Sequence, residues 1–112
     1  MTRITLPWPD RRLSSNARVH YMTKHKMTRA HRVRAGWAAL SAPIDVPADG
    51  DIIVRVTFNP PSRRGDRANM PHLVKAYLDG LADGWKVNDR RFLPEYIYGE
   101  PARGGLVTFE VD

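Results

Sequence analysis

Two aspartates and a lysine, Asp66, Lys75 and Asp89, have a spacing suited to chemistry on a phosphodiester. Asp66 lies in the arginine-rich turn 63–67, which runs directly into a predicted helix. The free N–H groups and partial positive charge of a helix N-terminus favour a phosphate. Asp89 follows the same helix on a polar loop. Two loop carboxylates beside cations can hold Mg²⁺ against a phosphodiester, because this hard ion prefers oxygen ligands and accepts phosphate as one.

Lys75 is placed to act at the same end of that helix. It lies six residues beyond Asn69, which is roughly 9 Å along a helix axis at about 1.5 Å per residue, so its side chain can reach toward the N-terminus. A purely structural interpretation of the acids stays open beside this one. Asp66 is equally suited to a turn or pre-cap position, and Asp89 to an Asn-Asp turn paired with Arg90 or Arg91.

The distribution of charge points to a polyanionic partner. Eighteen basic and twelve acidic side chains give a net charge of +6 over 112 residues. Residues 1–34 hold nine of the basic groups and one acid, for +8, which leaves −2 for the rest. A basic region of this kind favours nucleic acid as the first candidate partner, with a solvated basic surface as the alternative.

Length and composition limit the classes that remain. We expect residues 1–112 to form a single domain, since 42% hydrophobic and 27% charged residues are ordinary for a globular protein. No apolar run approaches 18 residues and no signal-peptide core is present, so we expect no membrane segment and a cytoplasmic location. The absence of cysteine excludes disulfides, thiolate zinc sites and a thiol nucleophile.

Hydrophobic periodicity predicts the first elements. A strand is expected over 2–8, followed by a basic loop over 10–26. Thr28 is suited to cap a helix over 29–41. The apolar stripe expected to face the core on this helix consists of Met27, Ala30, Val33, Trp37 and Leu40.

The second half of the chain alternates strand and helix patterns. A strand is expected over 51–58, and a helix capped by Asn69 over 70–83 with Gly84 as its stop. Two strands should follow over 95–99 and 106–111. The order β-α-β-α-β-β predicts an α/β (α+β) fold, with a small mixed β-sheet and two packed helices.

Several short motifs occur in an order that resembles one known family. They are Leu6-Pro7-Trp8-Pro9, Leu13-Ser14-Ser15-Asn16, the run Arg63-Arg64-Gly65-Asp66-Arg67-Ala68-Asn69, then Lys75, Asp79-Gly80-Leu81, Gly84 and Asn88-Asp89. Each motif is weak alone, whereas the ordered set covers nearly the whole chain. The chain resembles the RusA family of Holliday junction resolvases, which are common in phages and prophages.

The resemblance implies a RusA-like fold and a specific activity. It implies a homodimeric, Mg²⁺-dependent endodeoxyribonuclease, with Mn²⁺ as a substitute ion, that binds four-way DNA junctions and nicks strands of like polarity. Such a hydrolase would serve DNA recombination and repair in a bacterial or phage-infected host cell, without a small-molecule cofactor. Asp66, Asp89 and Lys75 match catalytic positions of the family, and the two aspartates match metal ligands.

Two departures from the family pattern define the alternative function. Ala68 stands where the family has its second Asp, and Asn88 stands where it has the first Asp of the later pair. Direct matching therefore gives two carboxylates where the resemblance implies three. Oxygens of Asn69, Asn88 and water can fill a Mg²⁺ shell, and recruitment of another acid such as Asp79 is a further option. The alternative is a DNA-binding protein that recognises branched structures without cutting them. An RNA- or protein-binding module is a third, weaker interpretation.

The remaining candidates are positions for nucleic-acid contact. The four histidines do not have metal-ligand spacing, and Tyr21 is the aromatic residue best placed in the basic region to stack on an unpaired base. Arginines near a helix N-terminus favour phosphate contact. The proposed DNA-binding residues are Asn16, Arg18, Lys24, Lys26, Arg63, Arg64, Arg67 and Asn69.

Overall fold

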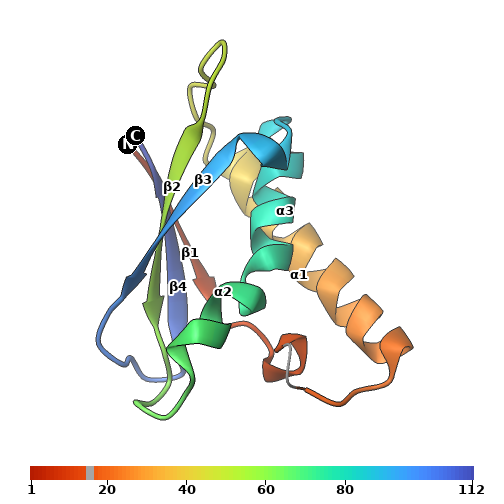
Figure 1. Cartoon of the computed structure of the whole chain (residues 1–112). Coiled ribbons are helices and arrows are strands. Elements are labelled where there is room, and N and C mark those ends of the chain that lie inside the picture. Colours follow the sequence, from red (N-terminus) through yellow and green to blue (C-terminus); the bar gives the residue numbers. More distant parts are fainter. Residues whose placement is uncertain (15–16) are drawn as a thin grey trace.

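A four-stranded mixed sheet carries the helices on one of its faces (Figure 1). The computed structural model describes residues 1–14 and 17–112. The strands are β1 (Thr2–Pro7), β2 (Ile52–Asn59), β3 (Phe92–Tyr98) and β4 (Leu106–Val111), in the spatial order β1-β4-β2-β3. β4 pairs antiparallel with both β1 and β2, and β3 pairs parallel with β2. The mixed sheet with packed helices confirms the expected fold class.

Alternation in β2 positions the core as the sequence predicts. Ile52, Val54, Val56 and Phe58 are buried beneath the helices, whereas Ile53 on the other face is 45% exposed. The β3 prediction was wrong by three residues, because the strand already begins at Phe92 and includes Pro94. A proline is tolerated there because β3 is an edge strand. On the outer side of such a strand there is no neighbour to accept a hydrogen bond, so the missing N–H of proline costs nothing.

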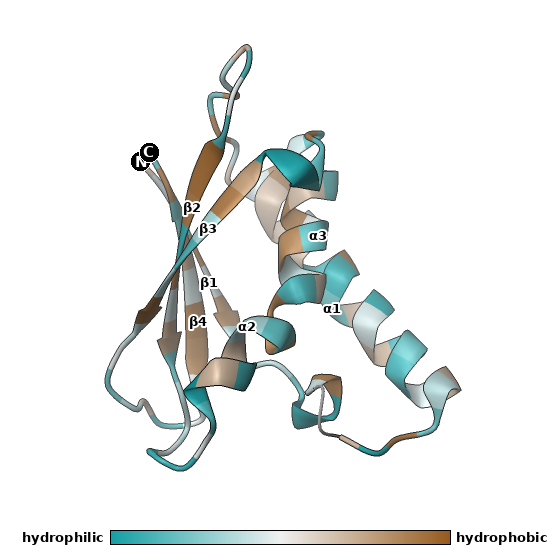
Figure 2. Cartoon of the chain, in the orientation of Figure 1, coloured by the Kyte–Doolittle hydropathy of each residue, from teal (hydrophilic) through white to brown (hydrophobic). Residues whose placement is uncertain are grey.

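The first long helix, α1 (Tyr21–Ser41), begins eight residues earlier than predicted, so the expected basic loop is wrong over residues 21–26. His20 caps it: its Nδ1 accepts a hydrogen bond of 3.2 Å from the Met22 N–H. Thr28, the predicted cap, lies inside the helix and donates from its hydroxyl to the Lys24 carbonyl at 2.8 Å. The N-terminal half of α1 is largely hydrophilic and extends away from the sheet (Figure 2).

The buried face of α1 is also different from the predicted one. Ala35 and Ala39 are fully buried, whereas Val33, Trp37 and Leu40 are 50%, 69% and 57% exposed. The large side chains face outward because α1 packs very closely against the helix α3 (Lys75–Trp85). A Cβ atom at Gly80 would lie only 2.1 Å from the carbonyl oxygen of Arg32, so only small residues fit between the two helices.

The predicted second helix is divided into two. η2 (Arg67–Asn69) leads into α2 (Met70–Leu73), and Val74 separates α2 from α3. Asp66 caps η2, and no side-chain cap bond from Asn69 starts α2, so the predicted cap was misplaced by three residues. Gly84 is helical and packs against α1. The helix ends at Trp85, and the following residue, Lys86, has a left-handed φ of 58°.

Tyr77 ties the helical layer to the sheet. Its ring is completely buried, edge-on to Phe109, and its hydroxyl donates to the Pro7 carbonyl at 2.9 Å. Two short 3-10 turns, η1 (Arg11–Leu13) and η3 (Asp89–Arg91), complete the elements. None of the described helices combines the length and apolar character needed to cross a bilayer.

Candidate active site

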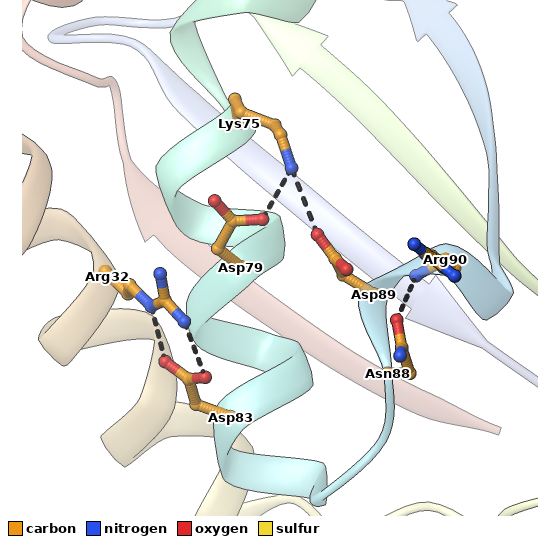
Figure 3. A network of polar contacts seen from close by, with 7 residues as sticks. All are labelled: Arg32, Lys75, Asp79, Asp83, Asn88, Asp89 and Arg90. Atoms are coloured by element: carbon orange, nitrogen blue, oxygen red, sulfur yellow. Dashed lines mark hydrogen bonds and ion pairs between the residues drawn. The ribbon is translucent and has the colours of Figure 1, made fainter.

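Lys75 lies between two carboxylates at the beginning of α3 (Figure 3). Its Nζ donates to Asp79 Oδ1 at 2.6 Å and to Asp89 Oδ2 at 3.2 Å. Asp79 faces it because residues four apart lie on one side of a helix. Asp89 reaches it because the chain turns at Lys86 and runs back along α3 into η3 (Figure 3). Asn88 fixes this return by accepting from the Arg90 N–H at 2.9 Å.

The hydrogen bonds of this cluster shift the pKa values of Lys75 and Asp89. The hydrogen bond to Asp79 is the largest cause of a raised pKa of Lys75, and the hydrogen bond to Asp89 adds to it. Burial of the ammonium group partly opposes this shift. The ammonium group in turn holds the pKa of Asp89 below its ordinary value. The lowered pKa keeps Asp89 ionised at neutral pH, and the Lys75 ammonium group is shared between two carboxyl groups. Carboxylate oxygens are also the type of ligand that Mg²⁺ prefers.

A second ion pair borders the cluster across the α1–α3 contact. Arg32 donates from Nε and from a terminal nitrogen to the two Asp83 oxygens at 2.6 and 2.9 Å (Figure 3). The guanidinium group lowers the pKa of Asp83. A cavity of about 300 Å³ is formed here. Its lining residues are Arg32, Asp79, Asp83, Val87, Asn88 and Asp89.

Asp66 serves as a turn residue in a different place. Its Oδ1 accepts from the Ala68 N–H at 2.9 Å and its Oδ2 from Asn69 Nδ2 at 3.0 Å. It lines a separate cavity of about 300 Å³, which also includes Trp8 and Arg64. The structure thus brings Lys75 and Asp89 together but places Asp66 against another cavity. Within residues 1–14 and 17–112, no group of three His, Asp or Glu side chains could hold a metal ion.

The proposed DNA-contact residues occupy two regions. Arg63, Arg64 and Arg67 are exposed on the segment between β2 and α2, and Asn69 is half-buried beside them. Arg63 also pairs with Glu100 at 2.7 Å, with both side chains largely exposed.

The other region is the start of α1. Lys24 and Lys26 lie on this helix rather than on the predicted loop. Arg18 is exposed just before it, and Tyr21 is 73% exposed at its first turn, stacked on His20. Asn16 lies outside the described residues.

Some residues at these sites were not identified from the sequence. Arg32 and Asp83 join α1 to α3 but are 51 positions apart in the sequence, so no local pattern reveals that they form an ion pair. Tyr96 and Tyr98 stack on Phe58 at the edge of the sheet, with centroids 5.8 and 5.4 Å away. The aromatic residues at alternate positions of the segment 92–98 could have indicated that Tyr96 and Tyr98 share one face of a strand.

Comparison with known proteins gives one informative relative. The chain is 37% identical, over 111 aligned residues, to an uncharacterized protein of Xylella fastidiosa (strain Temecula1 / ATCC 700964). The alignment covers 92% of this chain and 70% of the relative. No protein-family model matches the chain.

Proposed function

The chain belongs to the same family as the uncharacterized protein of Xylella fastidiosa, and we propose, from its own site and motifs, that it is a Mg²⁺-dependent endonuclease that resolves four-way DNA junctions. The observation that carries the proposal is the convergence of Asp79 and Asp89 on one cation, Lys75 Nζ, beside a polar cavity. The resemblance of the ordered motifs to the RusA family and the +8 charge of residues 1–34 support it.

The donor atoms fit a divalent ion. Asp79 and Asp89 present carboxylate oxygens to the same point, and Asn88 and Asp83 line the same cavity. Mg²⁺ usually binds through one or two carboxylates, substrate phosphate and water, so a full set of protein ligands is not required. When bound, the ion would supply Lewis-acid stabilisation and a more acidic water molecule.

Side chains of the protein would stabilise the remaining negative charge of the DNA. With Asp79 and Asp89 holding such an ion, the Lys75 ammonium group would face a phosphate oxygen and stabilise the charge that develops there. Arg63, Arg64 and Arg67 would neutralise phosphates of the same strand. Asp66 and Arg64 line a cavity separate from that of Asp89, so the contribution of Asp66 is tested separately.

The test is the nicking of a synthetic four-way junction with one labelled strand. Wild-type protein should nick it in Mg²⁺ or Mn²⁺ and not in a chelator. Asp89→Asn should lower the rate by about 100-fold or more, since ion binding is worth several kcal/mol of transition-state stabilisation, and Asp66→Asn tests the separate Asp66 cavity. The absence of cleavage above the Asp89→Asn level, over a range of both ions, would contradict the proposal.

The second candidate function is branched-DNA binding without cleavage, and Ala68 favours it. Ala68 is exposed next to Asp66, so a carboxylate fits at this position without repacking. Under this alternative the wild-type protein binds junctions in a strongly salt-dependent way and does not cut them. A gain of cleavage in Ala68→Asp, from an inactive wild type, would establish the alternative.

The exposed face of α1 is the proposed contact with a second copy of the chain. Val33, Trp37 and Leu40 border a groove of about 490 Å³, which Gly36 and Gly84 also line. In a two-fold dimer each Trp37 would enter the partner's groove, as an isologous interface requires.

Sedimentation tests this contact. Trp37→Glu should convert a dimer to a monomer, whereas Ile53→Glu, on the opposite face of the sheet, should leave the dimer intact. A wild-type protein that sediments as a monomer, or a dimer that both variants retain, would contradict this placement.

A further inference from the structure

A cavity of about 280 Å³ opens beside the arginine-rich segment, on the other side of the loop from Asp66. It is formed where the ends of β2 and β3 meet the segment 60–70. Gly65 and Met70 line both this cavity and the one that contains Asp66, so the two cavities share a wall. Apart from Arg63 and Arg67, the residues around this cavity have no part in the proposed nuclease chemistry.

Aromatic rings form one side of the cavity. Phe58 is fully buried, and Tyr98 lies against it with ring centroids 5.4 Å apart and planes only 19° apart. Tyr98 is 39% exposed and lines the cavity, so part of its ring is accessible to a ligand. An aromatic ring held in this way is a platform on which a planar group can stack.

The wall beyond the platform is held by backbone contacts. Gly99 N–H donates to the Phe58 carbonyl at 2.8 Å, and Ala102 N–H donates to the Pro60 carbonyl at 2.9 Å. Asn59 Nδ2 adds a third bond of 2.8 Å to the carbonyl of Glu100. The segment that carries Tyr98 into the cavity wall is therefore anchored to β2, and the cavity needs little reorganisation to accept a ligand.

Positive charge surrounds the entrance. Arg63 and Arg67 line the cavity, and both are exposed. Arg63 is paired with Glu100 at 2.7 Å, with side chains 77% and 80% exposed. An ion pair so open to water contributes little stability, so Arg63 can exchange Glu100 for a phosphate at low cost. An aromatic platform beside a basic rim is the combination that binds single-stranded nucleic acid.

We propose that this cavity receives one unstacked base of the DNA strand, which stacks on Tyr98 while Arg63 and Arg67 contact the flanking phosphates. The inference rests on the proposed function, because the shared wall places the base next to the strand that Asp66 would contact. The unpaired or distorted bases at the centre of a branched DNA are the source of such a base, since intact duplex keeps its bases stacked.

The chain offers a matched pair of variants. Tyr96 and Tyr98 lie on the same strand, stack on the same Phe58 and are 36% and 39% exposed, but only Tyr98 lines the cavity. The probes are a labelled five-nucleotide single strand and an abasic sugar–phosphate strand of the same length and charge. Fluorescence anisotropy at low salt gives the affinity of each protein for each strand.

The wild-type protein should bind the base-containing strand about 5- to 150-fold more tightly than the abasic strand, the range measured for one stacked base. Tyr98→Leu should abolish this preference, and Tyr96→Leu should retain it. Arg67→Gln, a second variant that leaves the sheet untouched, should weaken binding of both strands alike. A preference that Tyr98→Leu retains in full, or the absence of a preference in wild type, would overturn the proposal.

Measurements on a four-way junction and on a duplex with the same proteins separate this inference from the proposed function. Loss of the base preference in Tyr98→Leu, together with no junction cleavage by wild type, would contradict the nuclease and leave the base-binding cavity standing. Junction cleavage that Tyr98→Leu leaves unchanged, with no base preference in wild type, would contradict the cavity alone.

Discussion

The close contact of α1 with α3 predicts opposite outcomes for two glycine-to-alanine substitutions. A Cβ at Gly80 would lie 2.1 Å from the Arg32 carbonyl oxygen and 2.8 Å from the Ala35 Cβ, whereas a Cβ at Gly36 would meet only the Gly80 oxygen at 3.5 Å. Ordinary contact begins at 3.4 Å. Gly80→Ala therefore forces the helices apart by more than an ångström, and Gly36→Ala fits.

The magnitudes follow from packing and helix propensity. Overpacking of this kind lowers the free energy of unfolding by about 1–3 kcal/mol. Replacing a helical glycine with alanine at a site that accepts it raises the same free energy by roughly 0.5–1 kcal/mol. At roughly 4 °C per kcal/mol for a domain of this size, the two melting temperatures should differ by about 6 °C or more. Gly80→Ala should also separate Arg32 from Asp83.

Thermal and urea unfolding at one protein concentration provide the assay, and wild type is the common reference. The expected order of stability is Gly36→Ala, then wild type, then Gly80→Ala. A Gly80→Ala variant as stable as wild type would refute the account of the helix contact, and so would a Gly36→Ala variant destabilised as much as Gly80→Ala.

Three further outcomes are expected. Tyr77→Phe removes the 2.9 Å bond to the Pro7 carbonyl, and it should lower the free energy of unfolding by about 1 kcal/mol in urea titration. The depressed pKa of Asp83 stabilises the fold above the ordinary value of 3.8, and this contribution is lost as pH falls through the folded-state pKa. The stability difference between wild type and Asp83→Asn should therefore shrink below pH 3.8; a constant difference would contradict it. Lys75→Gln should raise the pKa of Asp89 in a carboxyl ¹³C NMR titration, because Lys75 is the main cause of its depression.

Most of the sheet could be predicted from the sequence because buried hydrophobic residues recur at every second position of a strand. The expected bounds of β2 and β4 agree with the structure to within one residue. Buried residues such as Val54, Val56 and Phe109 occupy every second position, a spacing that differs from that of a helix. The edge strand β3 was less clear because Pro94 interrupts its pattern. An isolated sequence does not show which strands will lie at an edge.

The helices were harder because their contact uses small residues. Val33, Trp37 and Leu40 form a regular apolar stripe, but Gly80 and Gly84 on α3 select the alanine face of α1 instead. Glycines separated by 44 or more positions from their contacts give no local signal. The apolar stripe is therefore exposed on this chain, and under the proposed dimer it forms the contact between the two copies.

The candidate site was partly accessible from the sequence. Lys75 and Asp79 are four residues apart on one helix, and the return of Asp89 toward them follows from a short loop after α3. The position of Asp66 depends on the path of the chain between β2 and α2. Gly65 there adopts a φ of 147°, outside the range of most residues, and local propensity did not indicate it.

The most direct test of the central claim is the anomalous scattering of crystals soaked in Mn²⁺. The account predicts a peak within roughly 2–2.5 Å of carboxylate oxygens of Asp79 and Asp89, with Lys75 Nζ displaced from between them. The peak should be absent from crystals of Asp89→Asn. An unchanged pair of Lys75 hydrogen bonds, with no Mn²⁺ at either aspartate in the wild-type protein, would contradict the claim that this cluster is a metal-dependent active site.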